Sequence, residues 1–265
     1  METNKSIALQ KIQAIFPCEN EFKDNIDVNG WFVNEIIPSD HPFLIRIAGQ
    51  SGTGKSSQIL PAISRCLENM HYINLSVARF SQFHPNYDNF MHYHKNNVRE
   101  LTNGFALRAL FLFVDHCIKK RVNIVLDLTF LDPAFETYIF TIAKQNGYTC
   151  ISNLMCVPKK VSDNFIKVRE QQSGRKVAIT TSLYQWNVLP RAVKAITKLN
   201  IFDDKDKFIL WSNTETKPIF VSGHNDRMCS TILNKYRSTK YIKSCDIEKS
   251  QADKYIWIMK FLKGC

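Results

Sequence analysis

The sequence lacks most features that mark fibrous, disulfide-rich or zinc-binding proteins. Its 265 residues include only 9 glycines and 9 prolines, and no internal repeat or low-complexity tract is present. Wholesale disorder and a fibrous chain are therefore excluded. The eight cysteines are scattered, without a Cys-x-x-Cys pair or a cysteine and histidine cluster at metal-ligand spacing. We interpret them as reduced thiols.

Long apolar runs are also missing. The chain begins Met-Glu-Thr-Asn-Lys, without an apolar run of signal-peptide length. No stretch approaches the roughly 20 apolar residues of a membrane span. We expect no membrane association and a bacterial cytoplasm as the compartment. Export by a route that leaves no such signal stays open.

The residues that are present describe an ordinary globular chain with a basic surface. Hydrophobic residues make up 45% and charged residues 22%, and the length suits one sizeable unit. The formal net charge is +11, from 35 Lys and Arg against 24 Asp and Glu. This sign favours anionic partners without choosing between phosphorylated metabolites, nucleic acid and membrane, and a solvated basic surface explains it equally well.

Apolar runs of strand length alternate with helical patterns from Pro42 onward. We expect strands at 43–48, 72–75, 122–126 and 148–157, and helices at 55–69, 104–120 and 133–145. This alternation predicts a three-layer α/β/α fold with a mostly parallel sheet, whose ligands bind at the carboxyl ends of the strands.

Helical patterns flank this core on both sides. Two amphipathic helices, at 4–16 and 20–36, are expected before it. After it come a polar helix ending near Gln172, a helix at 180–197, strands at 207–212 and 217–221, and a basic helical region at 225–262. We divide the chain into a helical N-terminal extension (1–40), a main domain (41–225) and a C-terminal helical region packed on that domain (226–265).

A phosphate-binding loop joins the first expected strand to the first helix of the core. The run Gly49-Gln50-Ser51-Gly52-Thr53-Gly54-Lys55-Ser56 matches the pattern GxxxxGK[ST] at every fixed position. Glycines let the backbone amides turn toward phosphate oxygens, and the following helix adds its positive end. We expect Lys55 to reach the β and γ phosphates and Ser56 to bind Mg²⁺.

This loop establishes nucleotide binding and leaves the reaction open, because kinases, GTPases and motor ATPases share it. The chain has no Asn-Lys-x-Asp run for guanine selection, and it is shorter than a motor. A small-molecule kinase with a P-loop kinase-like fold, using ATP (or GTP) and Mg²⁺, is the prediction.

Several motifs resemble the zeta toxin family over roughly residues 20–225. They are Phe80-Ser81-Gln82-Phe83-His84-Pro85-Asn86-Tyr87, Val157-Pro158-Lys159, Val168-Arg169-Glu170 and Leu189-Pro190. The resemblance implies a kinase that transfers the γ-phosphate of a nucleotide to the 3′-hydroxyl of UDP-N-acetylglucosamine. It also implies a small helical antitoxin as a possible partner. Arg169 and Arg175 look like the family's lid arginines, which clamp the phosphates.

The acceptor half of the site departs from the family pattern. The family's catalytic aspartate falls at Ala78, which accepts no proton, and a family glutamate falls near Phe111. Of the Gly-Thr-Gly-Arg-like run, only Thr129 is kept. We retain Thr129 as a substrate-binding candidate.

Asp127, at the end of the run 122–126, is the nearest candidate for a relocated acid. Three roles compete for it: holding Mg²⁺ through water, accepting the substrate proton, and, by the resemblance, contacting the sugar nucleotide. An ordinary strand end is the plain alternative. Asp88 is a more distant candidate for the base.

His84 has two interpretations. Its ring is a general base at neutral pH, or His-Pro fixes a loop beside the substrate, as the family suggests. We favour the second.

Three functions follow, in falling order. The first is a kinase of a nucleotide-like metabolite. The second is a catalytically degenerate relative that binds nucleotide or a partner protein, for which Ala78 is the best argument. The third is a basic nucleic-acid-binding ATPase, disfavoured because no aromatic-interleaved basic surface is evident.

Overall fold

The structure, a computed structural model, describes residues 2–15, 26–94, 97–129, 132–157 and 159–173. Beyond these it describes 207–212, 219–223 and single or paired residues between 177 and 206. Arg175 and the basic region at 225–262 lie outside the described residues. The division of the chain into 1–40, 41–225 and 226–265 therefore stays a prediction.

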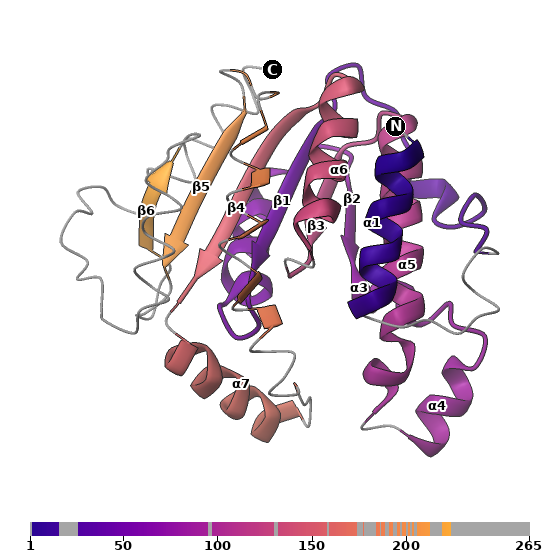
Figure 1. Ribbon diagram of the computed structural model, residues 1–265, viewed down its shortest axis with the longest axis vertical. Coiled ribbons are helices and arrows are strands. Elements are labelled where there is room, and N and C mark those ends of the chain that lie inside the picture. Colours follow the sequence, from indigo (N-terminus) through magenta and orange to yellow (C-terminus); the bar gives the residue numbers. More distant parts are fainter. Residues whose placement is uncertain are drawn as a thin grey trace.

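Within the described part of the chain, six strands form one sheet in the order β2-β3-β1-β4-β5-β6 (Figure 1). The first five strands run parallel, and β6 is antiparallel to β5. The mostly parallel α/β fold is confirmed. The strands are β1 (Phe43–Gly49), β2 (Ile73–Ser76), β3 (Ile124–Asp127), β4 (Thr149–Cys156), β5 (Lys207–Ser212) and β6 (Ile219–Gly223).

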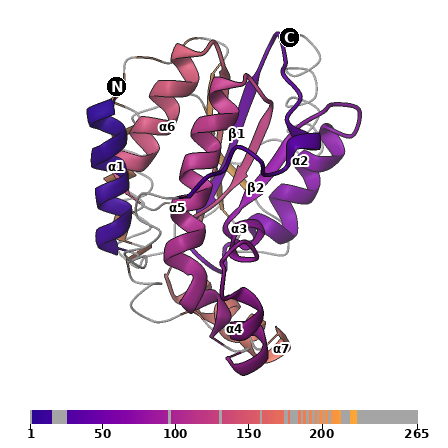
Figure 2. The same ribbon diagram turned by 90° about the vertical axis from the view of Figure 1, so that its right-hand side faces the viewer.

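Helices cover both faces of the sheet. Figure 2 shows α1 (Glu2–Ile15), α5 (Val98–Lys119) and α6 (Pro133–Gln145) on one side and α2 (Leu60–Cys66) on the other. A short α3 (Val77–Ser81) directly follows β2. Beyond the carboxyl ends of the strands lie α4 (Tyr87–Tyr93) and α7 (Lys159–Ser173) (Figure 1).

Strand β1 is buried along its whole length and has helices on both faces. Phe43, Ile45 and Ile47 belong to the apolar cluster on the α2 side, and Leu44 and Ala48 to the cluster under α5 and α6. This alternation is the period of two of an extended strand. Strand β1 therefore forms the centre of the core and carries the loop at its carboxyl end.

The expected helix at 20–36 is wrong where the structure describes it, from residue 26 onward. Residues 26–36 form turns and one short 3₁₀ segment, Val33–Glu35. Trp31 stacks on Phe83 at 4.3 Å between ring centroids, and Phe32 meets the same ring edge-on at 5.3 Å. Because consecutive helical side chains point about 100° apart, a helix does not bring both rings to Phe83. Phe32 adopts φ 51° to do so.

Helix α5 also differs from the expectation, since it begins at Val98 rather than near 104. By length and composition it is apolar enough to cross a membrane, although no run of that kind was expected. Most of this helix is buried in the protein, as in the core helix of many globular proteins. It forms the centre of the helical layer that also contains α1 and α6.

Candidate functional site

The loop between β1 and α2 curls through left-handed glycines. Gly52 has φ 74° and Gly54 has φ 91°, a region that side chains with a Cβ rarely adopt. The segment Lys55–Ile59 then starts as a π-helical turn before α2 begins. The loop therefore adopts a tight turn at the start of a helix, as the motif requires.

Lys55 is folded into its own loop. Its Nζ donates to the carbonyl oxygens of Gly49 at 2.9 Å and Gln50 at 2.8 Å. Burial lowers the pKa of Lys55 to about 8, although the negative charge of Asp127 acts to raise it. The nearby charges of Arg46, Arg169 and Arg99 lower it further. Several cations therefore converge where a polyphosphate is expected.

Ser56 and Asp127 are joined across the carboxyl edge of the sheet. The Ser56 hydroxyl donates to Asp127 Oδ2 at 2.7 Å. Asp127 is the last residue of β3 and pairs with Ile47 of β1, which lies two residues before the start of the loop. The strand register therefore places Asp127 next to the loop. A hydroxyl beside a carboxylate is an oxygen-only pair that suits Mg²⁺, so these two residues fit the predicted metal.

Helix α7 closes the loop from the other side. The Ser162 hydroxyl donates to the Ser51 carbonyl oxygen at 2.6 Å, and a Cβ on Gly52 would lie 2.6 Å from the Ser162 carbonyl oxygen. The Ser51 amide donates to Gln185 Oε1 at 2.9 Å. Arg169 comes from the same helix and is half-buried near Lys55. Helix α7 therefore packs on the loop that leads into α2.

A buried ion pair lies beside the loop on the α6 side. Arg46 of β1 and Glu136 of α6 have fully buried side chains and make two contacts, at 2.6 and 3.0 Å. Arg46 also donates to the carbonyl oxygens of Leu128 and Thr129. The pair contacts the segment that leaves β3 after Asp127.

The acceptor side carries fewer polar groups. Ala78 is exposed in α3, and Asp88 is exposed on α4. His84 is 2% exposed, its Nδ1 accepts from the Asn86 amide at 3.1 Å, and its ring packs on Phe105 at 5.0 Å. This environment suits the loop-fixing interpretation of His84, and a role at the substrate stays a prediction.

The structure brings Lys55, Ser56, Asp127 and Arg169 to the loop, and Thr129 follows Asp127 by two residues. Sequence reasoning missed Arg46, Arg99, Ser162 and Gln185. A lone arginine inside the apolar run 43–48 was a usable signal for a buried partner. The other three carry no signal that distinguishes them from surface residues.

The three free cysteines among the described residues take no part in this site. Burial raises the pKa of the Cys117 thiol to about 12 and also raises that of Cys150, while Cys66 is half-buried. Such thiols are poor nucleophiles at neutral pH.

Comparison with known proteins places this geometry in a family. The family model described as Zeta toxin matches residues 33–216. The chain belongs to the zeta toxin family. It therefore has the P-loop kinase-like fold that zeta toxins share, and the predicted resemblance to this family is confirmed.

Two solved structures share the fold of this zeta toxin family member. One comes from the PezAT chromosomal toxin-antitoxin system of Streptococcus pneumoniae, with a TM-score of 0.60 and 16% identity over 100% of this chain and 96% of the other. The other is AvrRxo1-ORF1:-ORF2 with ATP, with a TM-score of 0.51 and 12% identity over 99% and 84%. No curated protein sequence matches the chain.

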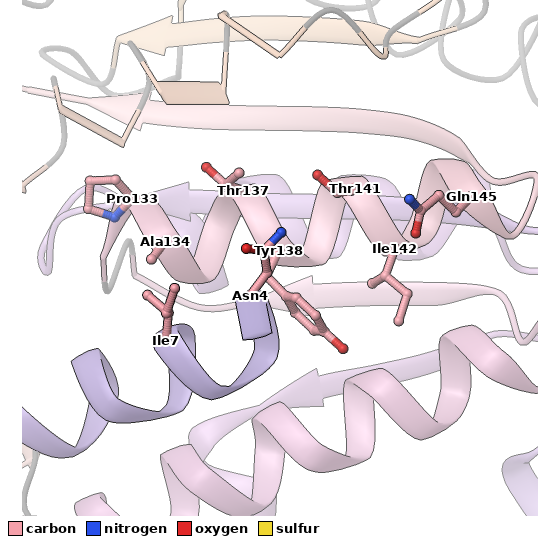
Figure 3. A pocket seen from close by; sticks show the side chains of 9 residues that line it. All are labelled: Asn4, Ile7, Pro133, Ala134, Thr137, Tyr138, Thr141, Ile142 and Gln145. Carbon is pink, nitrogen blue, oxygen red and sulfur yellow. The ribbon is translucent and has the colours of Figure 1, made fainter. Parts of the chain in front are cut away.

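A separate pocket lies between α1 and α6 (Figure 3). None of its lining residues belongs to the phosphate loop. They are Asn4, Ile7, Pro133, Ala134, Thr137, Tyr138, Thr141, Ile142 and Gln145.

Proposed function

We propose that the protein is a zeta-toxin-like kinase that binds ATP with Mg²⁺ at residues 49–56. It transfers the γ-phosphate to a hydroxyl of a nucleotide sugar, UDP-N-acetylglucosamine or a similar metabolite. The observation that carries this proposal is the 2.7 Å hydrogen bond between Ser56 and Asp127. In P-loop enzymes a serine or threonine and a strand-end aspartate of this kind hold the magnesium ion. The ATP in the AvrRxo1-ORF1:-ORF2 structure supports the choice of nucleotide, with GTP as the alternative.

Lys55 and Arg169 supply the charge for this reaction. On nucleotide binding, Lys55 exchanges its hydrogen bonds to the carbonyl oxygens of Gly49 and Gln50 for hydrogen bonds to phosphate oxygens. The Ser51 amide likewise exchanges its hydrogen bond to Gln185 for one to a phosphate oxygen. Arg169, together with Arg175 in the family's arrangement, neutralises charge that develops on the transferred phosphoryl group. Ser56 and Asp127 would hold Mg²⁺, which would supply positive charge to stabilise the transferred phosphoryl group.

The hydrogen bond to Ser56 favours the metal role for Asp127 over the role of proton acceptor. With Ala78 at the family's base position, no carboxylate of α3 takes the proton of the acceptor hydroxyl. Phosphoryl transfer depends mainly on positioning and electrostatics. We therefore propose slow transfer without a dedicated base: the acceptor oxygen bonds the γ-phosphorus, ADP leaves, and the hydroxyl proton is lost to solvent, with His84 and Thr129 beside the acceptor.

A degenerate nucleotide-binding relative is the second candidate. The exposed Ala78 in α3 is the observation that favours it. Such a protein binds ATP in calorimetry but yields no phosphorylated product from any metabolite pool.

We also propose a small helical antitoxin as a partner and a bacterial cytoplasm as the compartment. The fold neighbour from a toxin-antitoxin system supports the first. Co-expression with the neighbouring open reading frames, followed by purification of the complex, tests it. If expression of the protein arrests growth and none of these reading frames relieves the arrest, the proposed antitoxin is contradicted.

A metabolite extract with labelled ATP tests the kinase directly. Wild type is expected to transfer label to one acceptor, and Lys55→Ala to lose roughly 100-fold or more of that rate. Asp127→Ala is expected to lose both Mg²⁺ dependence and transfer. Lys119→Ala serves as the matched control, since its side chain is 54% exposed and lies 3.0 Å from Asp115 of the same helix, α5. Wild-type turnover in Lys55→Ala contradicts the proposal.

A further inference from the structure

An arginine and a glutamate lie in the core where apolar residues are the rule. Both side chains are 0% exposed. Arg46 Nε donates to Glu136 Oε2 at 3.0 Å, and Nη2 donates to Oε1 at 2.6 Å. Burial acts to raise the pKa of the Glu136 carboxyl, and the guanidinium opposes that rise. This two-pronged geometry holds the guanidinium in one orientation.

The remaining donors of Arg46 point at backbone carbonyls. Nη1 donates to Ile47 O at 2.7 Å and to Leu128 O at 2.5 Å, and Nη2 to Thr129 O at 3.3 Å. These carbonyls lie where β3 ends and β1 turns into the loop. The pairing of β3 with β1 and β2 ends at Asp127, so the carbonyl oxygens of Leu128 and Thr129 lie beyond the paired strands. Arg46 donates the hydrogen bonds that these two oxygens would otherwise accept from a neighbouring strand.

We propose that Arg46, held by Glu136, is a positioning residue for the metal and acceptor side of the site. It fixes the backbone on the carboxyl side of Asp127, and so aims that carboxylate at Ser56 and sets where Thr129 lies. This inference rests on the proposed kinase function. Arg46 acts through Asp127 and Thr129, because its own side chain is fully buried.

Stability alone does not account for such a pair. Taking two charges out of water costs about as much as their attraction returns, and apolar residues of similar volume often replace a buried pair without loss. Removing one partner leaves an uncompensated charge and is costly. What apolar side chains fail to replace is the set of hydrogen bonds to Leu128 and Thr129. The paired replacement therefore separates positioning from folding.

The test compares wild type with the double variant Arg46→Leu, Glu136→Leu. The double variant is expected to stay folded in thermal unfolding and to keep its affinity for ATP without Mg²⁺. The gain in ATP affinity on adding Mg²⁺ is expected to fall at least about tenfold, with a matching rise in the KM for ATP measured with Mg²⁺, and kcat is expected to fall as well. Asp115→Asn, which removes a buried charge from α5 away from the loop, is the control and keeps both values. A folded double variant with wild-type Mg²⁺ response and kcat overturns the inference.

Arg46→Lys is the second variant, should the double variant fail to fold. It keeps the charge beside Glu136 but lacks the fork that reaches the carbonyls, so the same losses are expected. Wild-type values in a folded Arg46→Lys overturn the inference.

Amide hydrogen exchange at Leu128 separates this inference from the kinase proposal. The Leu128 amide donates to Ile47 O at 3.1 Å, and that carbonyl oxygen also accepts from Arg46 Nη1. Faster exchange of this amide than in wild type is expected in either variant, whether or not any acceptor is phosphorylated. If wild type transfers no phosphate, the kinase proposal fails while this measurement still decides the inference. Unchanged exchange overturns it.

Discussion

Lys55 is a buried cation near other cations, and we expect its charge to govern phosphate binding by the loop. Burial lowers its pKa to about 8 from 10.5. Because the folded value lies below the unfolded one, the unfolded chain binds more protons between about pH 8 and 10.5, and this residue adds stability as pH rises through that window. Nucleotide binding has the opposite trend, since phosphate oxygens favour the protonated amine.

The first prediction concerns this pH dependence. ATP affinity is expected to be flat below about pH 8 and to weaken about tenfold per pH unit above it, because binding then takes up one proton. Calorimetry across that range measures the effect. Lys55→Arg keeps its charge and is the control, with no break near pH 8. A flat profile for wild type contradicts the prediction.

At this scale the sequence predicts the loop well and its surroundings poorly. Lys55 and Ser56 follow from a local pattern whose backbone geometry is fixed by glycines. The bond from Ser56 to Asp127 spans 71 positions and depends on which strands are neighbours. Asp127 was recognisable as a strand-end acid, but only the β1 to β3 pairing shows that it lies beside Ser56, which supports the proposed metal role. The burial of Arg46 is explained only by its ion pair with Glu136, which lies 90 positions away in the sequence.

At the scale of elements, α7 packs so closely on the loop that Gly52 has no room for a side chain. The second prediction is that Gly52→Ala lowers ATP affinity at least about tenfold, together with stability, because φ 74° strains alanine and its Cβ meets the Ser162 carbonyl. Gly147→Ala is the matched control. Gly147 has φ 77° but meets only the Arg121 side chain at 3.4 Å. It is expected to lose stability and keep ATP affinity, and equal affinities for both variants contradict the prediction.

The third prediction concerns the start of α6, the helix that carries Glu136. Asp132 Oδ1 accepts from the Ala134 amide at 2.8 Å, and Pro133 occupies the first turn. Asp132→Ala is expected to cost about 1 kcal/mol in urea unfolding, because the cap is lost. Asp132→Ser keeps a capping oxygen and should recover most of that loss. An Ala variant as stable as wild type contradicts the role of the cap.

This cap also explains why some elements were predictable. The helix expected at 133–145 has the observed bounds of α6, and the Asp132 cap with Pro133 in the first turn accounts for its sharp start. The segment 20–36 shows a similar apolar period, yet residues 26–36 are turns. There the aromatic cluster of Phe80, Phe83 and Phe113 attracts Trp31 and Phe32 together, and tertiary packing overrides the local pattern.

At the scale of the whole molecule, Asp115 joins three helices of one layer. It accepts from Lys5 of α1 at 2.8 Å and from Tyr138 of α6 at 2.6 Å, and it lies 3.0 Å from Lys119 of its own α5. Burial acts to raise the pKa of Asp115, but these hydrogen bonds outweigh it and hold the pKa below 3.8. The cluster thus attaches the N-terminal helix to the kinase-like core.

The fourth prediction follows from this attachment. Asp115→Ala is expected to destabilise the protein by about 3 kcal/mol, because the Lys5 ammonium and the Tyr138 hydroxyl lose a buried partner that is 5% exposed. The stabilisation by Asp115 is present above about pH 4 and is lost as pH falls through its depressed folded pKa, so the difference from wild type should shrink in acid. Lys119→Ala, which removes a half-exposed partner, should cost under about 1 kcal/mol.

Because the cluster lies in the helical layer and the loop at the strand ends, ATP affinity below the unfolding temperature should match wild type in both variants. Equal urea midpoints for Asp115→Ala and wild type would show that α1 is held by its apolar face, through Ala8 and Ile12, without help from the charge cluster.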